Sequence, residues 1–257
     1  MTAGVDDKPS LAGPLAKVRR AESHLRTFEA SWQKVIDAAA FTFIHEVNAD
    51  GVSHRYRAVD VPELDDRWPL LLGDCAINLR AALDALAREL VRANGGVADD
   101  LVTFPVNTTP GGVVVEGGIA DDALLLIEEV QPSAASPESD RIAAIDAVAV
   151  AARGRLLACS SGATGHRVPV KGVNPAPQIV EVWTSDRPLE PGKTVHGYTY
   201  GEQYLGSDPS VQMLPHLVLE EPAVAAHFGR IDASILFGDK LIPWVREQYL
   251  PRFEPFF

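Results

Sequence analysis

Residues 70–92 read LLLGDCAINLRAALDALARELVR and form the most regular pattern in the chain. Apolar side chains recur there at steps of three and four residues, which is the spacing of one face of an α-helix. That face consists of Trp68, Leu72, Cys75, Leu79, Leu83 (or Ala82), Leu86 and Leu90. Gly95 and Gly96 follow, where a left-handed C-cap is expected. The pattern predicts a long amphipathic helix that packs in a core.

The polar side of this helix carries most of the candidate site residues. Asp74 and Asn78 are four residues apart, as are Arg80 and Asp84, so each pair shares one side of the helix. Short polar side chains are poor helix formers, so Asp74 and Asn78 each need a packing or hydrogen-bonding reason to be there. Arg80 with Asp84 is either a functional pair or a surface or half-buried ion pair. Together with Arg155, these residues form either a candidate cleft between the second and fourth helices or a structural polar cluster.

The rest of the chain alternates between helical and β patterns. Further helices are predicted over residues 15–39, 121–130, 138–159 and 231–250, the last with Pro243 inside it. A hairpin is predicted around residues 48–51, and strands over residues 168–170, 179–183, 195–200, 211–219 and 224–228. Residues 160–165, which are rich in Ser and Gly, are expected to form turns.

These elements predict an α+β protein in which a helical bundle packs with a mostly antiparallel β-sheet. Three parts are expected along the chain: a mobile tail over residues 1–14, a helical bundle with a β-hairpin insertion over residues 15–161, and a β-rich region with a closing C-terminal helix over residues 162–257. The last two parts form either two docked halves or one continuous domain.

Composition limits the classes of function. The 257 residues are 46% hydrophobic and 23% charged, which is typical of a globular protein. A formal net charge of -12 argues against non-specific binding to nucleic-acid phosphates. No apolar run reaches the ~20 residues of a membrane span, and the first residues do not resemble a signal peptide. We therefore expect no membrane association and a cytoplasmic location, or a virion-associated one if the chain is encoded by a phage.

Metal and cofactor chemistry is not expected from the sequence. The chain has seven histidines and two cysteines, and none of the histidines are spaced as paired ligands on a helix. Cys75 and Cys159 lie in apolar contexts and are predicted to be buried free thiols. The aromatic residues of the β-rich region form either a ligand groove or a half-buried sheet face; they are Trp183, Tyr198, Tyr200 and Tyr204.

Residues 72–87 resemble the motif G-D-x-x-H-N-L-R-S-A-L-D-H-L of an uncharacterised protein family of actinobacteria and their phages. Further elements of that family are similar to Phe104-Pro105, Val130-Gln131-Pro132 and Arg155-Leu156-Leu157. The motif's Arg, separated from a His by four residues, is similar to the site of the HEPN superfamily, helical bundles many of which are ribonucleases. The resemblance implies a HEPN-like bundle. In such sites the Arg orients phosphate and the His transfers a proton.

This chain departs from the family at the histidines. Arg80 matches the motif Arg, but Ala85, Ile77 and Gly154 stand where the family has His. Without those imidazoles, the helix has no acid or base for RNA cleavage. The leading hypothesis is therefore a non-catalytic scaffold or interaction protein, in a phage or phage-derived context, that acts with a protein partner or as a homo-oligomer. The alternatives are a HEPN-like enzyme or toxin acting on RNA or a nucleotide, and a small-ligand-binding module.

Overall fold

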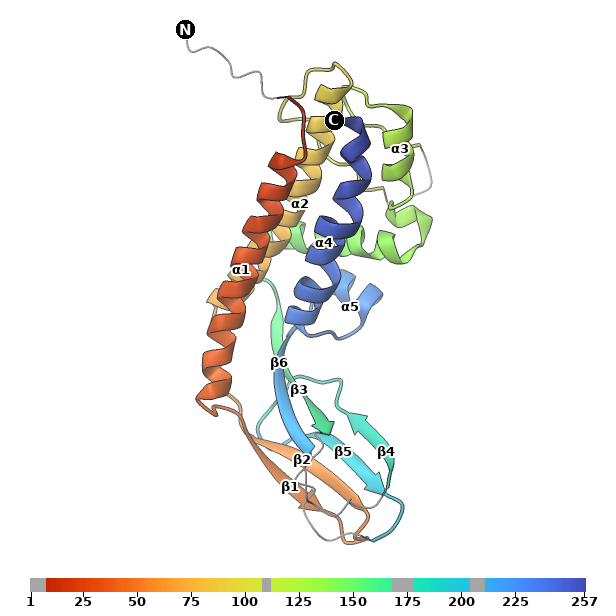
Figure 1. The fold of residues 1–257 in the computed structure, drawn as a ribbon. Coiled ribbons are helices and arrows are strands. Elements are labelled where there is room, and N and C mark those ends of the chain that lie inside the picture. Colours follow the sequence, from red (N-terminus) through yellow and green to blue (C-terminus); the bar gives the residue numbers. More distant parts are fainter. Residues whose placement is uncertain (1–7, 108–111, 168–177, 204–210) are drawn as a thin grey trace.

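The computed structural model describes residues 8–107, 112–167, 178–203 and 211–257, and it has an elongated shape with two lobes (Figure 1). Helices gather in one lobe, and antiparallel β-strands form the other. The predicted α+β class is therefore confirmed, as is the antiparallel character of the sheet.

Two long helices form the centre of the helical lobe. α1 (Ala12–Asp37) and α2 (Arg67–Ala93) pack against each other over much of their length. The apolar stripe predicted for α2 is buried in the core. Gly95 has a φ of +80°, and the N–H of Gly96 donates to the Val91 carbonyl at 2.9 Å. The predicted left-handed cap therefore ends α2.

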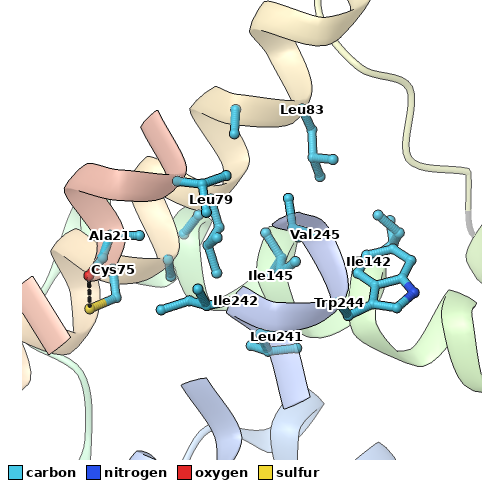
Figure 2. Packing of buried hydrophobic residues seen from close by; sticks show 14 of the residues in the cluster. Ala21, Cys75, Leu79, Leu83, Ile142, Ile145, Leu241, Ile242, Trp244 and Val245 are labelled. Carbon is cyan, nitrogen blue, oxygen red and sulfur yellow. Dashed lines mark hydrogen bonds between the residues drawn. The ribbon is translucent and has the colours of Figure 1, made fainter. Parts of the chain in front are cut away.

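The remaining helices close this core around α2. α3 (Asp121–Glu128) and the short η1 (Pro132–Ala134) precede α4 (Pro137–Gly154), and the chain ends in η2 (Ile235–Leu241), η3 (Trp244–Tyr249) and η4 (Leu250–Phe256). Figure 2 shows Leu79 of α2, Ile145 of α4 and Val245 of η3 in one buried cluster. The helix predicted over residues 231–250 is present, because the chain is helical from residue 233 to residue 256, and within it η2 and η3 have wide, π-type turns. Pro243 lies between them in helical backbone, where its missing N–H removes a hydrogen bond that a regular α-helix would make.

The β-lobe contains a sheet with the strand order β1-β2-β5-β4. Its strands are β1 (Thr42–Val47), β2 (Ser53–Asp60), β4 (Ile179–Thr184) and β5 (Thr194–Tyr200). A ribbon of β3 (Cys159–Arg167) and β6 (Val211–Leu219) lies against this sheet, where Ala163 and Tyr198 share one buried cluster. The strand predicted over residues 168–170 lies outside the described residues.

The chain passes between the two lobes several times. The β1–β2 hairpin leaves the helical lobe between α1 and α2, β3 leaves it after α4, and the C-terminal segment returns to the helical core. Both cores therefore contain residues from either side of residue 161. A division at that position separates the chain in sequence but not in space.

Several predicted boundaries differ in the structure. Residues 160–165, expected to be turns, belong to β3, because they pair with β6 in an unbroken antiparallel ladder. Gly162 and Gly165 leave room on this strand for the rings of His216 and His196. Residues 224–228, expected to be a strand, lie in α5 (Pro222–Phe228), whose first residue is a proline, as helix starts favour. α1 begins inside the tail predicted over residues 1–14, of which residues 1–7 lie outside the described part.

Both cysteines are free thiols; Cys75 is buried, as predicted, whereas Cys159 is only partly buried. Cys75 is buried against α1, where its thiol donates to the Ala21 carbonyl at 3.3 Å (Figure 2). Burial raises the pKa of both thiols, that of Cys159 to about 12, which disfavours thiolate chemistry. Among the described helices, none is long and apolar enough to cross a membrane.

Candidate functional site

Arg80 lies at the centre of a partly buried polar cluster. This Arg80 cluster comprises Arg80, Asp84, Asp146 and the backbone of Phe104. Arg80 Nη2 is 3.3 Å from Asp84 Oδ1, and Arg80 Nε is 3.2 Å from Asp146 Oδ1. The side chains of Arg80, Asp84 and Asp146 are 12%, 14% and 31% exposed. Two carboxylates thus flank a guanidinium that is largely buried from solvent.

The Arg80 cluster also holds the backbone of an irregular segment. Arg80 Nη2 donates to the Phe104 carbonyl at 2.7 Å, and the Phe104 N–H donates to Asp84 Oδ1 at 3.0 Å. Phe104 is fully buried, and buried backbone groups outside regular secondary structure need such partners. Arg80 Nη1 is closed off from solvent and has no acceptor in the described structure. The cluster therefore has the geometry of a clamp that joins α2, α4 and the segment around Phe104.

Asp74 and Asn78 make contacts of their own. Asn78 Nδ2 donates at 2.8 Å to the carbonyl of Asp74, one turn earlier in α2. The Asp74 side chain is half exposed, and its Oδ2 lies 3.7 Å from Nδ1 of His24 on α1. These contacts within α2 and at the protein surface explain why Asp74 and Asn78 are polar, so neither residue needs a role in binding a substrate.

Arg155 follows α4 and binds a different acid. Its Nη1 and Nη2 atoms donate to the two carboxylate oxygens of Glu221 at 2.9 and 2.7 Å. Glu221 is buried and also accepts the Ala158 N–H at 3.0 Å. This bidentate pair fastens the end of α4 to the start of α5. The predicted residues thus form three groups: Asp74 with Asn78, Arg80 with Asp84, and Arg155.

Asp146 is the member of the Arg80 cluster that sequence reasoning missed. It lies in the middle of α4, in the run IAAIDAVAV, in which all the remaining residues are apolar. A carboxylate within such a helix needs a cationic partner to offset its loss of hydration. That isolated charge in the sequence could have indicated a buried ion pair at Asp146. The sequence does not indicate that the partner is Arg80.

A second candidate site lies inside the β-lobe, on the sheet face that the β3–β6 ribbon covers. This His–Tyr cluster comprises His45, His54, Tyr56, His196, Tyr198 and Tyr200. His45 Nε2 and His54 Nδ1 are 2.9 Å apart, so one ring donates a hydrogen bond to the other. His54 also stacks on Tyr198, with ring centroids 5.1 Å apart. The sequence signal was alternation, since all members except His45, which lies on β1, occupy every second position of β2 and β5.

Burial governs the chemistry of the His–Tyr cluster. His54, His196 and Tyr198 are 2%, 3% and 1% exposed. Burial lowers the pKa of His196 and raises the pKa of Tyr198, so both side chains are neutral at about pH 7. Neutral, buried side chains such as His196 and Tyr198 suit packing better than proton transfer to a substrate. Within the described ranges, no group of His, Cys, Asp or Glu has the arrangement of a metal site.

The aromatic residues considered for a ligand groove do not share one surface. Tyr198 and Tyr200 are buried in the His–Tyr cluster. Trp183 lies on the opposite face of the sheet, where its ring covers Gly197 so closely that a Cβ there would come within 2.5 Å of it. Neighbouring residues of a strand point to opposite faces, which explains the separation. Tyr204 lies outside the described residues.

No family model, curated protein or solved structure matches this chain. Its function must therefore follow from the chemistry of its own residues. Of the two candidate sites, the Arg80 cluster holds the fold together, and the three tyrosines of the His–Tyr cluster belong to the β-lobe core.

The stability of the protein should fall as the pH is lowered, because His196 resists protonation in the folded state. Burial lowers its folded pKa below the ordinary value of 6.5, so the unfolded state takes up the proton first. The stabilisation is complete above about pH 6.5 and is lost as the pH falls towards the folded pKa, by up to about 1.4 kcal/mol per pH unit. Urea denaturation between about pH 8 and about pH 5.5 measures this slope.

His196→Gln is the comparison that isolates this residue. The variant should be less stable than wild type at about pH 8, and the difference in unfolding free energy should shrink towards about pH 5.5. Burial also lowers the pKa of His216, but that residue titrates in both proteins and cancels in the difference. A difference that does not change with pH would contradict a neutral, buried His196.

Proposed function

We propose that this chain is a non-catalytic interaction protein whose helical lobe is a HEPN-like scaffold. One observation carries the proposal: the guanidinium of Arg80 is engaged by Asp84, Asp146 and the Phe104 carbonyl. An Arg that acts on a phosphate group must direct its donors at the substrate. Here Nε and Nη2 of Arg80 stabilise the fold. The likeness to the actinobacterial and phage family belongs to this proposal and is consistent with a scaffold that has lost the motif histidines.

The β4 strand offers a contact surface for a partner. β4 is hydrogen-bonded to β5 on one side, and no other described strand pairs with its outer edge. Val180 and Val182 of β4 are 62% and 59% exposed. Exposed apolar edge strands are templates for the addition of a strand from another chain. We therefore expect a partner segment to bind β4 in an extended conformation.

The charge on β4 favours a different protein over a second copy of this chain. Glu181 lies between the two exposed valines. An antiparallel pairing of β4 with itself would bring two Glu181 side chains close together, and like charges opposite one another destabilise a strand pair. A partner strand that carries an apolar or basic residue at that position avoids this repulsion.

Val182→Glu should weaken partner binding by about tenfold or more, because it places an unpaired carboxylate in the proposed interface. Affinity capture from a native lysate, followed by mass spectrometry of the retained proteins, measures the loss. Val150→Glu is the matched control, since Val150 is 57% exposed but lies on α4 in the helical lobe. Equal retention of the partner by both variants would contradict binding at β4. Cleavage of single-stranded RNA by the wild-type protein would contradict the non-catalytic role itself.

A further inference from the structure

A groove of about 520 Å³ lies along α1, beside the start of α2, and involves neither the Arg80 cluster nor β4. Its polar lining consists of three cationic residues and three hydroxyl residues: Arg26, Lys34, Arg67, Ser23, Thr27 and Ser31. No carboxylate lines it. In a chain with a net charge of -12, a groove lined by three cations and no carboxylate points to an anionic ligand.

Helix geometry brings these side chains together. Ser23, Thr27 and Ser31 are spaced four residues apart on α1, so they follow one another along the same face of the helix. Arg67 is the first residue of α2, which packs against α1. The groove is therefore built on two long helices rather than on loops, and its shape does not depend on the residues outside the described ranges.

The donors of Arg67 and Ser31 are oriented by contacts outside the groove. Asp65 accepts hydrogen bonds from Nε of Arg67 at 2.9 and 3.0 Å and also engages Nη2, which fixes the plane of the guanidinium. This Arg67 contact lowers the pKa of Asp65 to about 2. Ser31 Oγ accepts the indole N–H of Trp68 at 2.9 Å, so its own O–H remains able to donate.

The other two cations are only weakly neutralised. Arg26 forms one ion pair in the described structure, with Glu22 at 3.9 Å, and its charge also interacts with Glu29. Lys34 forms no ion pair with any described residue. Their charges are therefore available to an anion in the groove.

An apolar hollow adjoins the cationic groove. It has a volume of about 260 Å³ and shares Thr27, Ser31 and Arg67 with the groove, while Leu70 and Leu71 complete its lining. Leu70 is 54% exposed, although it belongs to an amphipathic helix with a long buried face. The two hollows together present cations and hydroxyls at one end and leucine side chains at the other.

We propose that this groove binds a small phosphorylated molecule, with its phosphate among Arg26, Lys34 and Arg67 and its apolar part against Leu70 and Leu71. Guanidinium, ammonium and hydroxyl groups are the side-chain donors that phosphate prefers. The volume lies within the roughly 300–1,000 Å³ of small-molecule sites. The two-part lining suits a phosphate ester better than free phosphate, because an ester can also bury apolar surface on the leucines.

Titration of the full chain with phenyl phosphate, followed by ¹H–¹⁵N NMR at about 150 mM NaCl, tests this proposal. Chemical-shift changes should map to residues 23–34 and 67–71. Phenyl phosphate should bind about tenfold more tightly than inorganic phosphate, because the ring occupies the apolar hollow. The double variant Arg26→Gln with Lys34→Gln should weaken binding of phenyl phosphate by about tenfold or more.

Arg19→Gln with Arg20→Gln is the matched control. It removes the same charge from exposed positions of α1 that do not line the groove, so it should leave the affinity within about twofold. If both double variants weakened the binding of phenyl phosphate equally, the loss would be due to long-range electrostatics, and the proposed site would be wrong. Shifts that map elsewhere, equal affinities for the two phosphates, or a response to anionic lipid vesicles but not to phenyl phosphate would also overturn it.

Discussion

Arg80→Ala should lower the free energy of unfolding by about 3 kcal/mol or more, because it leaves Asp84 and Asp146 partly buried without their cation. The Phe104 carbonyl loses its donor at the same time. Urea denaturation followed by circular dichroism measures the loss. Hydrogen exchange should accelerate around Phe104, because the backbone contact that holds this segment is weakened.

Arg88→Ala is the matched control for this prediction. Arg88 stands on the same helix and donates to the Val102 carbonyl at 3.3 Å, but it forms no ion pair in the described structure. Its loss should cost about 1 kcal/mol or less. The double variant Arg80→Ala with Asp146→Ala should lose less unfolding free energy than the sum of the two single variants, because it also removes one of the carboxylates that Arg80→Ala leaves unpaired. Equal costs for the two Arg variants, or simple additivity, would contradict a structural clamp.

Gly165→Ala should destabilise the β-lobe by about 2–3 kcal/mol through overpacking. A Cβ at this position would lie 2.2 Å from Nε2 and 2.3 Å from Cδ2 of His196. His196 cannot move aside freely, since it is buried and its Nδ1 is 3.0 Å from Thr184 Oγ1. Near-ultraviolet circular dichroism should show a disturbed tyrosine environment, whereas the helical signal in the far ultraviolet should persist, because the two lobes have separate cores.

Gly154→Ala provides the control for this substitution. Gly154 ends α4, and a Cβ there would meet nothing within 4 Å. Alanine at that site should be neutral or stabilising by up to about 1 kcal/mol. A second change, His196→Ser, should recover part of the stability that Gly165→Ala loses, because it removes the ring with which the new methyl group clashes. If both alanine variants behave alike, the close approach of His196 to β3 is wrong.

The fold was most predictable where local pattern and burial agree. The stripe on α2 could be predicted because a helix with one long apolar face has to bury that face. The hairpin could be predicted for a similar local reason. Gly51 takes a φ of +66°, and Asp50 Oδ1 accepts the N–H groups of Val52 and Ser53, both at 2.9 Å.

Other features depend on contacts between residues far apart in the chain, which pattern reasoning does not provide. Gly162 and Gly165 look like turn residues, yet they lie in β3, which pairs with the distant strand β6, and histidine rings from other strands occupy the space that a side chain would need. The candidate polar residues could be predicted individually, but their partners could not. Arg155 finds Glu221, 66 positions later, and Arg80 finds the backbone of Phe104, 24 positions later. Those partners determine whether a polar residue belongs to a functional site or stabilises the fold.

Native mass spectrometry of the wild-type chain, purified gently from its own cells, tests the central claim most directly. A protein that acts by association should be recovered with a second polypeptide bound. That polypeptide should protect the backbone amides of β4 from hydrogen exchange. Recovery of the bare monomer alone would contradict the proposed interaction function, as would a bound partner that leaves β4 unprotected and protects the helical lobe instead.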